Sequence, residues 1–245
     1  MASIVSPVAA TRAERHVFFP AMAVAVAVAV FAGFSRTYFL RSWTGTPPLP
    51  SALVHWHAAI FTAWVVLFIV QTTLVASSRI RLHRRLGVAA GPLAVTMIAV
   101  GYITSIEGAR RGFIGQFPDE ASGFTDPFAF LILGLGDILL FTVFVSLGFY
   151  FRRRPATHKR LMLLATLNLV PAALIRLPLG VARIPFAALM ITALLAAGPI
   201  YDWRIHRRVH PVFVSGGLVT FISGPIRPVI GNTVVWHRFA AWLCG

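Results

Sequence analysis

The histidines are the side chains of this chain best suited to chemistry, and two of them open an apolar run. His55 and His57 stand at the head of LVHWHAAIFTAWVVLFIVQTTLVA, residues 53–76. Such imidazoles can ligate haem iron or a metal ion, or they can belong to the aromatic belt where a helix leaves the membrane. Positions two apart on a helix point about 200° apart, so only one can face a bundle. His57 shares a face with Trp64 and Gln71. We therefore expect His57 to point inward as a candidate metal ligand, with His55 at the lipid headgroups.

A second pair of histidines occurs in two similar phrases. RLHRRLG contains His83 and THKRLM contains His158, and each phrase leads into an apolar helix on the same side of the membrane. We expect the two imidazoles at the same depth, where they could be axial ligands of one b-type haem or ligands of a metal ion. Neighbouring cations could pair with haem propionates: Arg84, Arg85, Lys159 and Arg160. The alternative is that both histidines are ordinary polar residues of a basic interfacial turn.

The spacing of the histidines separates these candidate sites. His57 and His83 lie near opposite ends of neighbouring helices, and 26 helical positions correspond to about 39 Å. They cannot bind one metal together, so any cofactor must be assembled on one side. His206 and His210 have the i, i+4 spacing of a metal pair, but they lie in a solvated basic loop just before Pro211.

Three polar residues are predicted at membrane depth: Asp137, Asn168 and Arg176. We expect Asp137, in LGLGDILLF, to be the only acid inside a helix, with Asn168 and Arg176 as its partners. An acid within the bilayer is costly and is a functional candidate by default. The residues could form a proton or small-molecule pathway, or a structural pair that fixes helix packing.

The composition predicts the class of fold. The chain has 245 residues, of which 58% are hydrophobic and 12% charged, against about 25% charged in soluble domains. Several apolar stretches have the length of roughly 18 residues or more that crosses a bilayer. We expect an all-α polytopic bundle in one domain, 1–245, with about seven transmembrane helices. The predicted helices cover about 17–34, 53–76, 87–106, 128–151, 161–179, 185–201 and 211–230, with an interfacial segment at about 234–243.

Two of these segments carry further local signals. The last predicted span is interrupted by Gly216-Gly217 and by GPIRP (224–228), so a six-helix chain with a re-entrant end is the alternative. GVAAG (87–91) has the GxxxG spacing that lets helices approach closely.

The charge distribution predicts orientation and partners. The net charge is +15, and the basic residues cluster in RIRLHRR (79–85), RRRPATHKR (152–160) and RIHRR (204–208). Short basic loops between apolar spans are typical of the cytoplasmic side and attract anionic lipids. We therefore expect a bacterial cytoplasmic (inner) membrane protein with a cytoplasmic N-terminus, embedded in the lipid bilayer, and no nucleic-acid partner.

The chain lacks the residues that several classes of membrane protein need. Lys159 is the single lysine and lies in a loop phrase, so a retinal Schiff base in the last helix is excluded. Cys244 is the single cysteine, which excludes an intrachain disulfide and an iron–sulfur cluster. No P-loop or dinucleotide fingerprint is present.

The phrases HWHAAIFTAWVVLFIVQTTL, LHRRLG and THKRLMLLAT resemble those of bacterial multi-pass membrane proteins in uncharacterised, domain-of-unknown-function families. The resemblance covers about residues 53–170. More distantly, the chain is similar to membrane factors of haem–copper oxidase assembly and to b-type transmembrane cytochromes. That resemblance implies His57, His83 and His158 as haem or metal ligands, in electron transfer or respiratory oxidase assembly. The remaining alternative is a non-catalytic accessory subunit that works with other membrane subunits.

Overall fold

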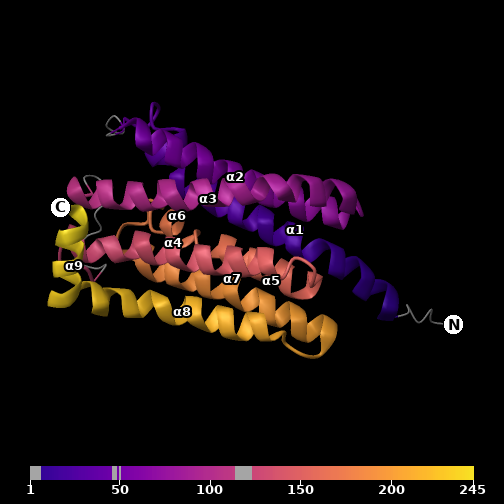
Figure 1. Ribbon diagram of the computed structural model, residues 1–245. Helices are drawn as coiled ribbons and strands as arrows, with labels where there is room; N and C mark the ends of the chain where they lie inside the picture. Colours follow the sequence, from indigo (N-terminus) through magenta and orange to yellow (C-terminus); the bar gives the residue numbers. More distant parts are fainter. Residues whose placement is uncertain (1–6, 46–48, 50, 114–122) are drawn as a thin grey trace.

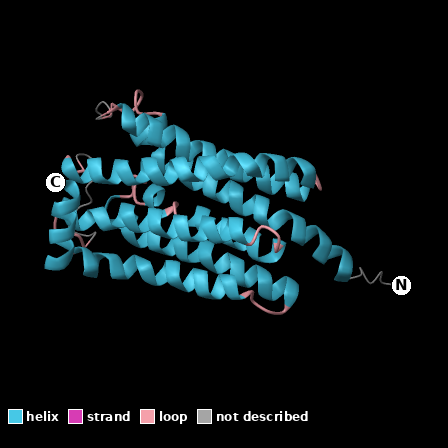
Figure 2. Cartoon of the chain, in the orientation of Figure 1, coloured by secondary structure: helices cyan, strands magenta, loops and turns pink. Residues whose placement is uncertain are grey.

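The chain folds into helices joined by short connections. The computed structural model describes residues 7–45, 49, 51–113 and 123–245, and these ranges contain no β-strand (Figure 2). The α-helices are α1 (Pro7–Phe34), α2 (Ala52–Ala76), α3 (Ile80–Arg110), α4 (Pro127–Tyr150), α5 (Pro155–Leu167), α6 (Pro171–Leu174), α7 (Arg183–His206), α8 (Pro211–Gly231) and α9 (Val234–Cys244). A π-helical turn, η1 (Ser35–Phe39), extends α1, and a 3₁₀ turn, η3 (Gly180–Ala182), precedes α7.

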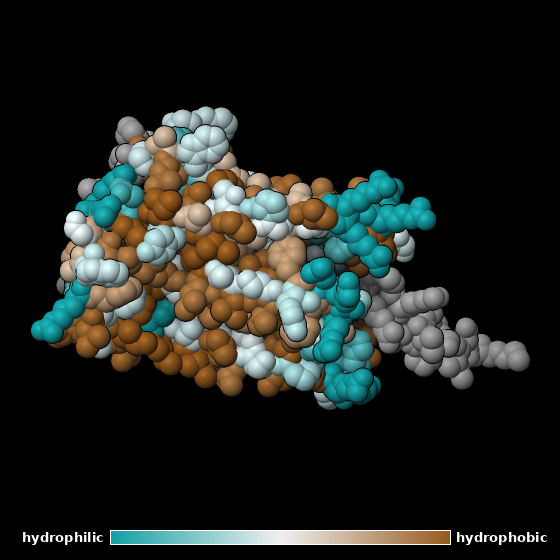
Figure 3. Space-filling model, in the orientation of Figure 1, coloured by the Kyte–Doolittle hydropathy of each residue, from teal (hydrophilic) through white to brown (hydrophobic). Residues whose placement is uncertain are grey.

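The long helices run side by side as a bundle, and α9 lies across one of its ends (Figure 1). Within the described ranges, six helical segments are long and apolar enough to cross a membrane: Val17–Phe39, Ala52–Ala76, Ile80–Arg110, Pro127–Tyr150, Arg183–His206 and Pro211–Gly231. Hydrophobic side chains cover much of the length of the bundle (Figure 3). The predicted all-α polytopic bundle is therefore confirmed.

The two ends of the bundle differ in charge. At one end, hereafter the basic end, lie the connections after α2, α4 and α7, which carry or adjoin the three basic clusters. Hydrophilic side chains gather there in Figure 3. At the other end, hereafter the α9 end, lie α6, η3 and the C-terminal helix (Figure 1). Within the described residues, the segment from α5 to η3 makes one further passage between the two ends, in addition to the six long helical segments.

The predicted continuous helix over 161–179 is wrong. Helix α5 starts earlier, at Pro155, and ends at Leu167, and a turn over Asn168–Val170 leads into the four-residue α6. Pro171 has no N–H to continue the hydrogen-bond ladder. Backbone groups freed at membrane depth need internal partners. At the break, the backbone N–H groups of Leu169 and Val170 donate to the carbonyls of Thr166 and Leu167. The side-chain amide of Asn168 links the break to α4 by donating to the Asp137 carbonyl at 2.7 Å.

The predicted last helix, about 211–230, is confirmed, and the alternative of an interrupted, re-entrant end is not borne out. Helix α8 continues from Pro211 to Gly231 through Pro225 and Pro228. The α8 face at Gly216 packs tightly, since a Cβ there would lie 2.5 Å from Cδ1 of Leu164.

The core lies where α5 passes between its neighbours. Leu163–Leu167 are all buried, as expected for a helix that is apolar on every side. The indole of Trp64 donates to Thr166 Oγ1 at 3.2 Å and packs edge-on against Phe141. Close helix contacts occur at other glycines than the GVAAG sequence predicts: a Cβ on Gly91 would meet nothing within 4 Å, whereas a Cβ on Gly33 would lie 2.1 Å from the carbonyl oxygen of Ala173.

Candidate functional site: two imidazoles at the basic end

His83 and His158 lie side by side at the basic end. His83 is in the first turn of α3 and His158 in the first turn of α5. Their ring centroids are 6.3 Å apart and the ring planes meet at 75°. Nδ1 of His158 is 2.8 Å from the carbonyl oxygen of Gly148. Since a carbonyl only accepts, Nδ1 carries a hydrogen, and in the neutral ring Nε2 then has the free lone pair.

The side chain of Gln71 holds the other imidazole. With its amide oriented to satisfy both neighbouring backbone groups, its nitrogen lies 2.5 Å from His83 Nδ1 and 3.2 Å from the His83 carbonyl. Its oxygen then accepts from the Gly87 N–H at 2.9 Å. In this orientation the hydrogen of neutral His83 sits on Nε2; rotating the amide by 180° would favour the Nδ1–H tautomer instead. A metal that binds His83 through Nε2 therefore requires the rotated amide, whose oxygen accepts from Nδ1–H.

The cations near this pair differ in their surroundings. Arg84 and Arg85 are exposed. The ammonium of Lys159 lies 4.8 Å from the centroid of the Phe19 ring. Arg160 is buried and forms a two-pronged ion pair with Asp202 of α7. The expectation that Arg160 pairs with haem propionates therefore needs correction, since its charge is already matched inside the protein.

Asp202 was missed by the sequence reasoning. Helix α7 ends at His206 rather than near 201, so Asp137 is not the only acid within a helix. The Asp202 carboxylate is fully buried and also accepts from the backbone N–H of His210 at 3.0 Å. A charge buried this deeply is stable only with its partners. The signal available in the sequence was the phrase YDWR, an acid directly after an apolar run.

His206 and His210 do not face each other as a metal pair. Nδ1 of His206 lies 3.6 Å from Asp202. Nδ1 of His210 accepts from the backbone N–H of Val212 at 3.2 Å and caps α8. Burial, and then the charge of Arg160, lower the pKa of His210 below its ordinary value. A neutral imidazole suits the capping role, because its Nδ1 must accept.

Asp137 has a different partner from the predicted one. Its carboxylate is paired with the guanidinium of Arg227, from α8. Arg227 also reaches the carbonyl oxygen of Leu133 at 3.4 Å. Asn168 contacts the backbone of Asp137, as described above, and Arg176 lies over the Phe34 ring at 5.0 Å and donates to the carbonyl of Ala172. The predicted pairing of Asp137 with Arg176 is wrong; the cation that serves it stands in GPIRP.

Three further histidines, His55, His57 and His237, lie at the α9 end. His57 stacks on Phe61 with 4.0 Å between ring centroids, and its Nδ1 is buried without a hydrogen-bond partner among the described residues. His55 is exposed and lies 3.4 Å from the hydroxyl of Tyr38. His237 belongs to another cluster.

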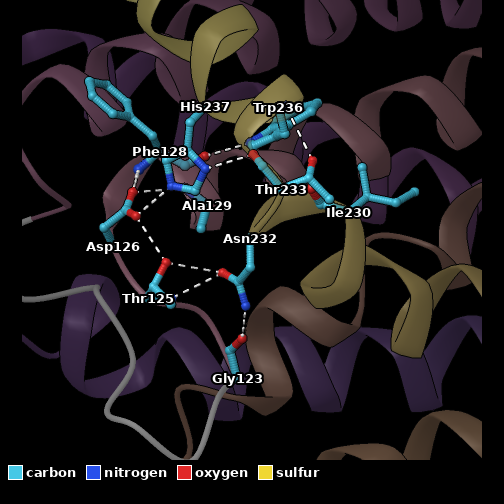
Figure 4. Close-up of polar contacts among 10 residues, drawn as sticks. All are labelled: Gly123, Thr125, Asp126, Phe128, Ala129, Ile230, Asn232, Thr233, Trp236 and His237. Atoms are coloured by element: carbon cyan, nitrogen blue, oxygen red, sulfur yellow. Dashed lines mark hydrogen bonds and ion pairs between the residues drawn. The ribbon is translucent and has the colours of Figure 1, made fainter.

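That cluster joins α9 to the start of α4 (Figure 4). Asp126 caps α4 by accepting from the N–H groups of Phe128 and Ala129, and its second oxygen lies 2.6 Å from Nε2 of His237. Nδ1 of His237 lies 2.9 Å from the carbonyl oxygen of Thr233. Both ring nitrogens therefore face acceptors, which favours the doubly protonated imidazolium.

The electrostatics of this cluster follow from those contacts. The Asp126 carboxylate raises the pKa of His237 above its ordinary value of 6.5. Burial alone would raise the pKa of Asp126, but the hydrogen bonds from His237 and the α4 backbone outweigh it and hold that pKa below 3.8. The indole of Trp236 adds a bond to the carbonyl of Phe128 at 2.7 Å. We name this set of contacts the α9 clamp.

Two further observations bear on the function. Among the described residues, no group of three or more His, Cys, Asp or Glu side chains could hold a metal ion. Comparisons with protein-family models, with curated proteins and with solved structures found no match to this chain. The six long apolar helices make it a multi-pass helical membrane protein.

Proposed function

We propose that this integral membrane protein binds one metal centre, a b-type haem or a single metal ion, between His83 and His158. The observation that supports the proposal most is the contact of these two imidazoles, which come from helices distant in sequence. A haem supplies four nitrogen ligands to its iron, so two axial histidines would complete the coordination of the iron.

The spacing of the rings suits such a centre. An imidazole nitrogen binds a metal at about 2.0–2.1 Å, so two rings on opposite sides of one metal have centroids about 6 Å apart. The separation here is 6.3 Å, and the 75° between ring planes is compatible because each ring can rotate about its metal–nitrogen axis. The bond from His158 Nδ1 to the Gly148 carbonyl is the second-shell contact that metal-bound histidines usually make.

The basic surroundings suggest how the centre would be oriented. Exposed Arg84 and Arg85, with Lys159, would pair with propionates or other anions at the membrane surface. We infer that the basic end faces the cytoplasm of a bacterial inner membrane, where anionic lipids surround it. The resulting role is electron transfer or respiratory oxidase assembly, together with other membrane subunits.

Absorption spectroscopy and metal analysis of the purified protein test this proposal. We expect a Soret band, or binding of one copper or haemin per chain after titration. His83→Ala and His158→Ala should each abolish the signal, whereas His206→Ala, at the same end of the bundle, should leave it unchanged. A wild-type protein that carries no haem or metal, and takes up neither haemin nor copper, would rule the proposal out.

A second candidate function, a proton or small-molecule pathway, is favoured by one observation. The ion pair Asp137–Arg227 lies beside the break between α5 and α6. Ionisable pairs beside broken helices within the membrane are typical of transport sites. Proton flux into proteoliposomes would fall with Asp137→Asn if the pair conducts protons; unchanged flux would assign the pair to helix packing.

A further inference from the structure

Buried polar atoms without hydrogen-bond partners gather at the α9 end of the bundle. Within the part of the chain that the structure describes, these are Thr37 Oγ1, Ser51 Oγ, His57 Nδ1 and Thr104 Oγ1. Native proteins leave few buried polar atoms unsatisfied, and each such atom needs an explanation, for example water or a ligand. Several such atoms at one end of the bundle indicate a site whose hydrogen bonds the protein alone does not complete.

Two of these atoms belong to α2 and α3, which pack against each other. The ring of Phe61 comes within 3.2 Å of where a Cβ on Gly101 would lie, which fixes the register of these antiparallel helices. One turn toward the α9 end from that contact brings His57 on α2 and Thr104 on α3 to the same level. The His57 imidazole is held there by its stack on Phe61.

A positive charge and a further hydroxyl come from the opposite side. The guanidinium of Arg176 packs on the Phe34 ring and acts electrostatically on His57. Thr37 lies in η1, the π-helical turn that follows Phe34 at the end of α1. Because α1 packs on α2 and α6, and α2 packs on α3, these polar groups lie at the same end of neighbouring elements.

The chemistry of this set selects its ligand. Hydroxyls, an imidazole N–H and a guanidinium can all donate hydrogen bonds, and the guanidinium adds positive charge. The complementary ligand has acceptor oxygens and a negative charge, and a planar carboxylate matches a guanidinium in both respects. The rings of Phe34 and Phe61 would give it apolar walls. We propose that His57, Thr104, Thr37 and Arg176 form a binding site for a carboxylate, independent of any metal centre at the basic end.

The carboxylate could arrive from the water or from the membrane. Either a small soluble acid or the head of a fatty acid in the adjacent leaflet offers the same oxygens. Probes of different chain length separate the two sources: acetate has no tail to place in lipid, whereas octanoate does.

Isothermal titration calorimetry of the full-length protein in a neutral detergent, with acetate and with octanoate, tests the site. We expect saturable binding to the wild type, weakened at least tenfold by His57→Phe, which keeps the stack on Phe61, and by Arg176→Gln. Thr104→Val, a change of one hydroxyl, should weaken binding several-fold. His55→Phe, two residues away on the exposed face, is the matched control and should bind like the wild type.

The two probes also decide the source. Binding of octanoate without acetate assigns a membrane-borne acid, and equal binding of both assigns a soluble one. If neither probe binds the wild type saturably, or if folded His57→Phe and Thr104→Val bind as tightly as the wild type, the site is not a carboxylate site.

Discussion

The guanidinium of Arg160, on α5, and the carboxylate of Asp202, on α7, form an ion pair at fully buried positions beneath the basic end. Nε of Arg160 donates to Asp202 at 2.9 Å, and the His210 backbone adds a third bond to the carboxylate. This network ties α5, α7 and the start of α8 together. It therefore stabilises the segment that carries His158.

Removing one member of that pair should destabilise the protein strongly. Asp202→Ala leaves the Arg160 charge buried without its carboxylate, which costs about 3–5 kcal/mol. Thermal unfolding in detergent measures the loss. Arg111→Ala, which breaks the half-exposed pair with Glu107, is the control and should cost less than about 1 kcal/mol. Equal effects of the two substitutions would show that Asp202 does not anchor the bundle.

Gln71 should tune the metal centre without ligating it. Gln71→Leu removes the amide whose oxygen, once rotated, accepts from Nδ1–H of His83 and leaves Nε2 to bind the metal. Loss of such an outer contact typically weakens metal binding about 10–100-fold. Titration with haemin or copper would report the change. Thr72→Val is the matched control, because the Thr72 hydroxyl bonds only to carbonyls of its own helix. A Gln71→Leu protein with wild-type affinity would contradict this positioning role.

The α9 clamp should hold only within a window of pH. The pKa of His237 is raised in the folded protein, so its contribution is complete below 6.5 and is lost as the pH rises through the raised value. The pKa of Asp126 is lowered, so its contribution is complete above 3.8 and is lost as the pH falls through the lowered value. The clamp is thus strongest between about 3.8 and 6.5.

Hydrogen exchange of the α9 amides checks this window. Protection should be highest within it and decline toward alkaline pH. His237→Gln should lower protection at acidic pH and remove the alkaline decline, because glutamine does not titrate in this range. Protection that declines identically in the wild type and in His237→Gln would assign the pH effect to another group.

Gly33 should be intolerant of any side chain. A Cβ there would overlap the carbonyl oxygen of Ala173, so Gly33→Ala must push α1 away from α6 and lower the melting temperature. Gly91→Ala provides the contrast, since its Cβ would meet nothing within 4 Å and alanine favours a helix by about 1 kcal/mol over glycine. A Gly33→Ala protein as stable as Gly91→Ala would mean that the contact of α1 with α6 is loose.

Much of the fold follows from the sequence because a bilayer imposes simple rules. Apolar runs of the right length become helices, since only helices satisfy their own backbone in lipid. The alternation of basic loops implies that His83 and His158 begin helices at the same end. Pro171 also marks the break in the crossing from α5 to η3, although the sequence pattern predicts a continuous helix over 161–179.

The tertiary structure decided which of these residues meet. Sequence pattern limits His83 and His158 to one end of the bundle, but only the packing of the helices brings their rings to 6.3 Å. The partners of Asp137, Asp202 and Asp126 are Arg227, Arg160 and His237, and each comes from a different helix. Hydropathy sets how deep a residue lies and helical phase sets which face it occupies. Neither specifies the neighbour across an interface, because that depends on how the helices pack and rotate against one another.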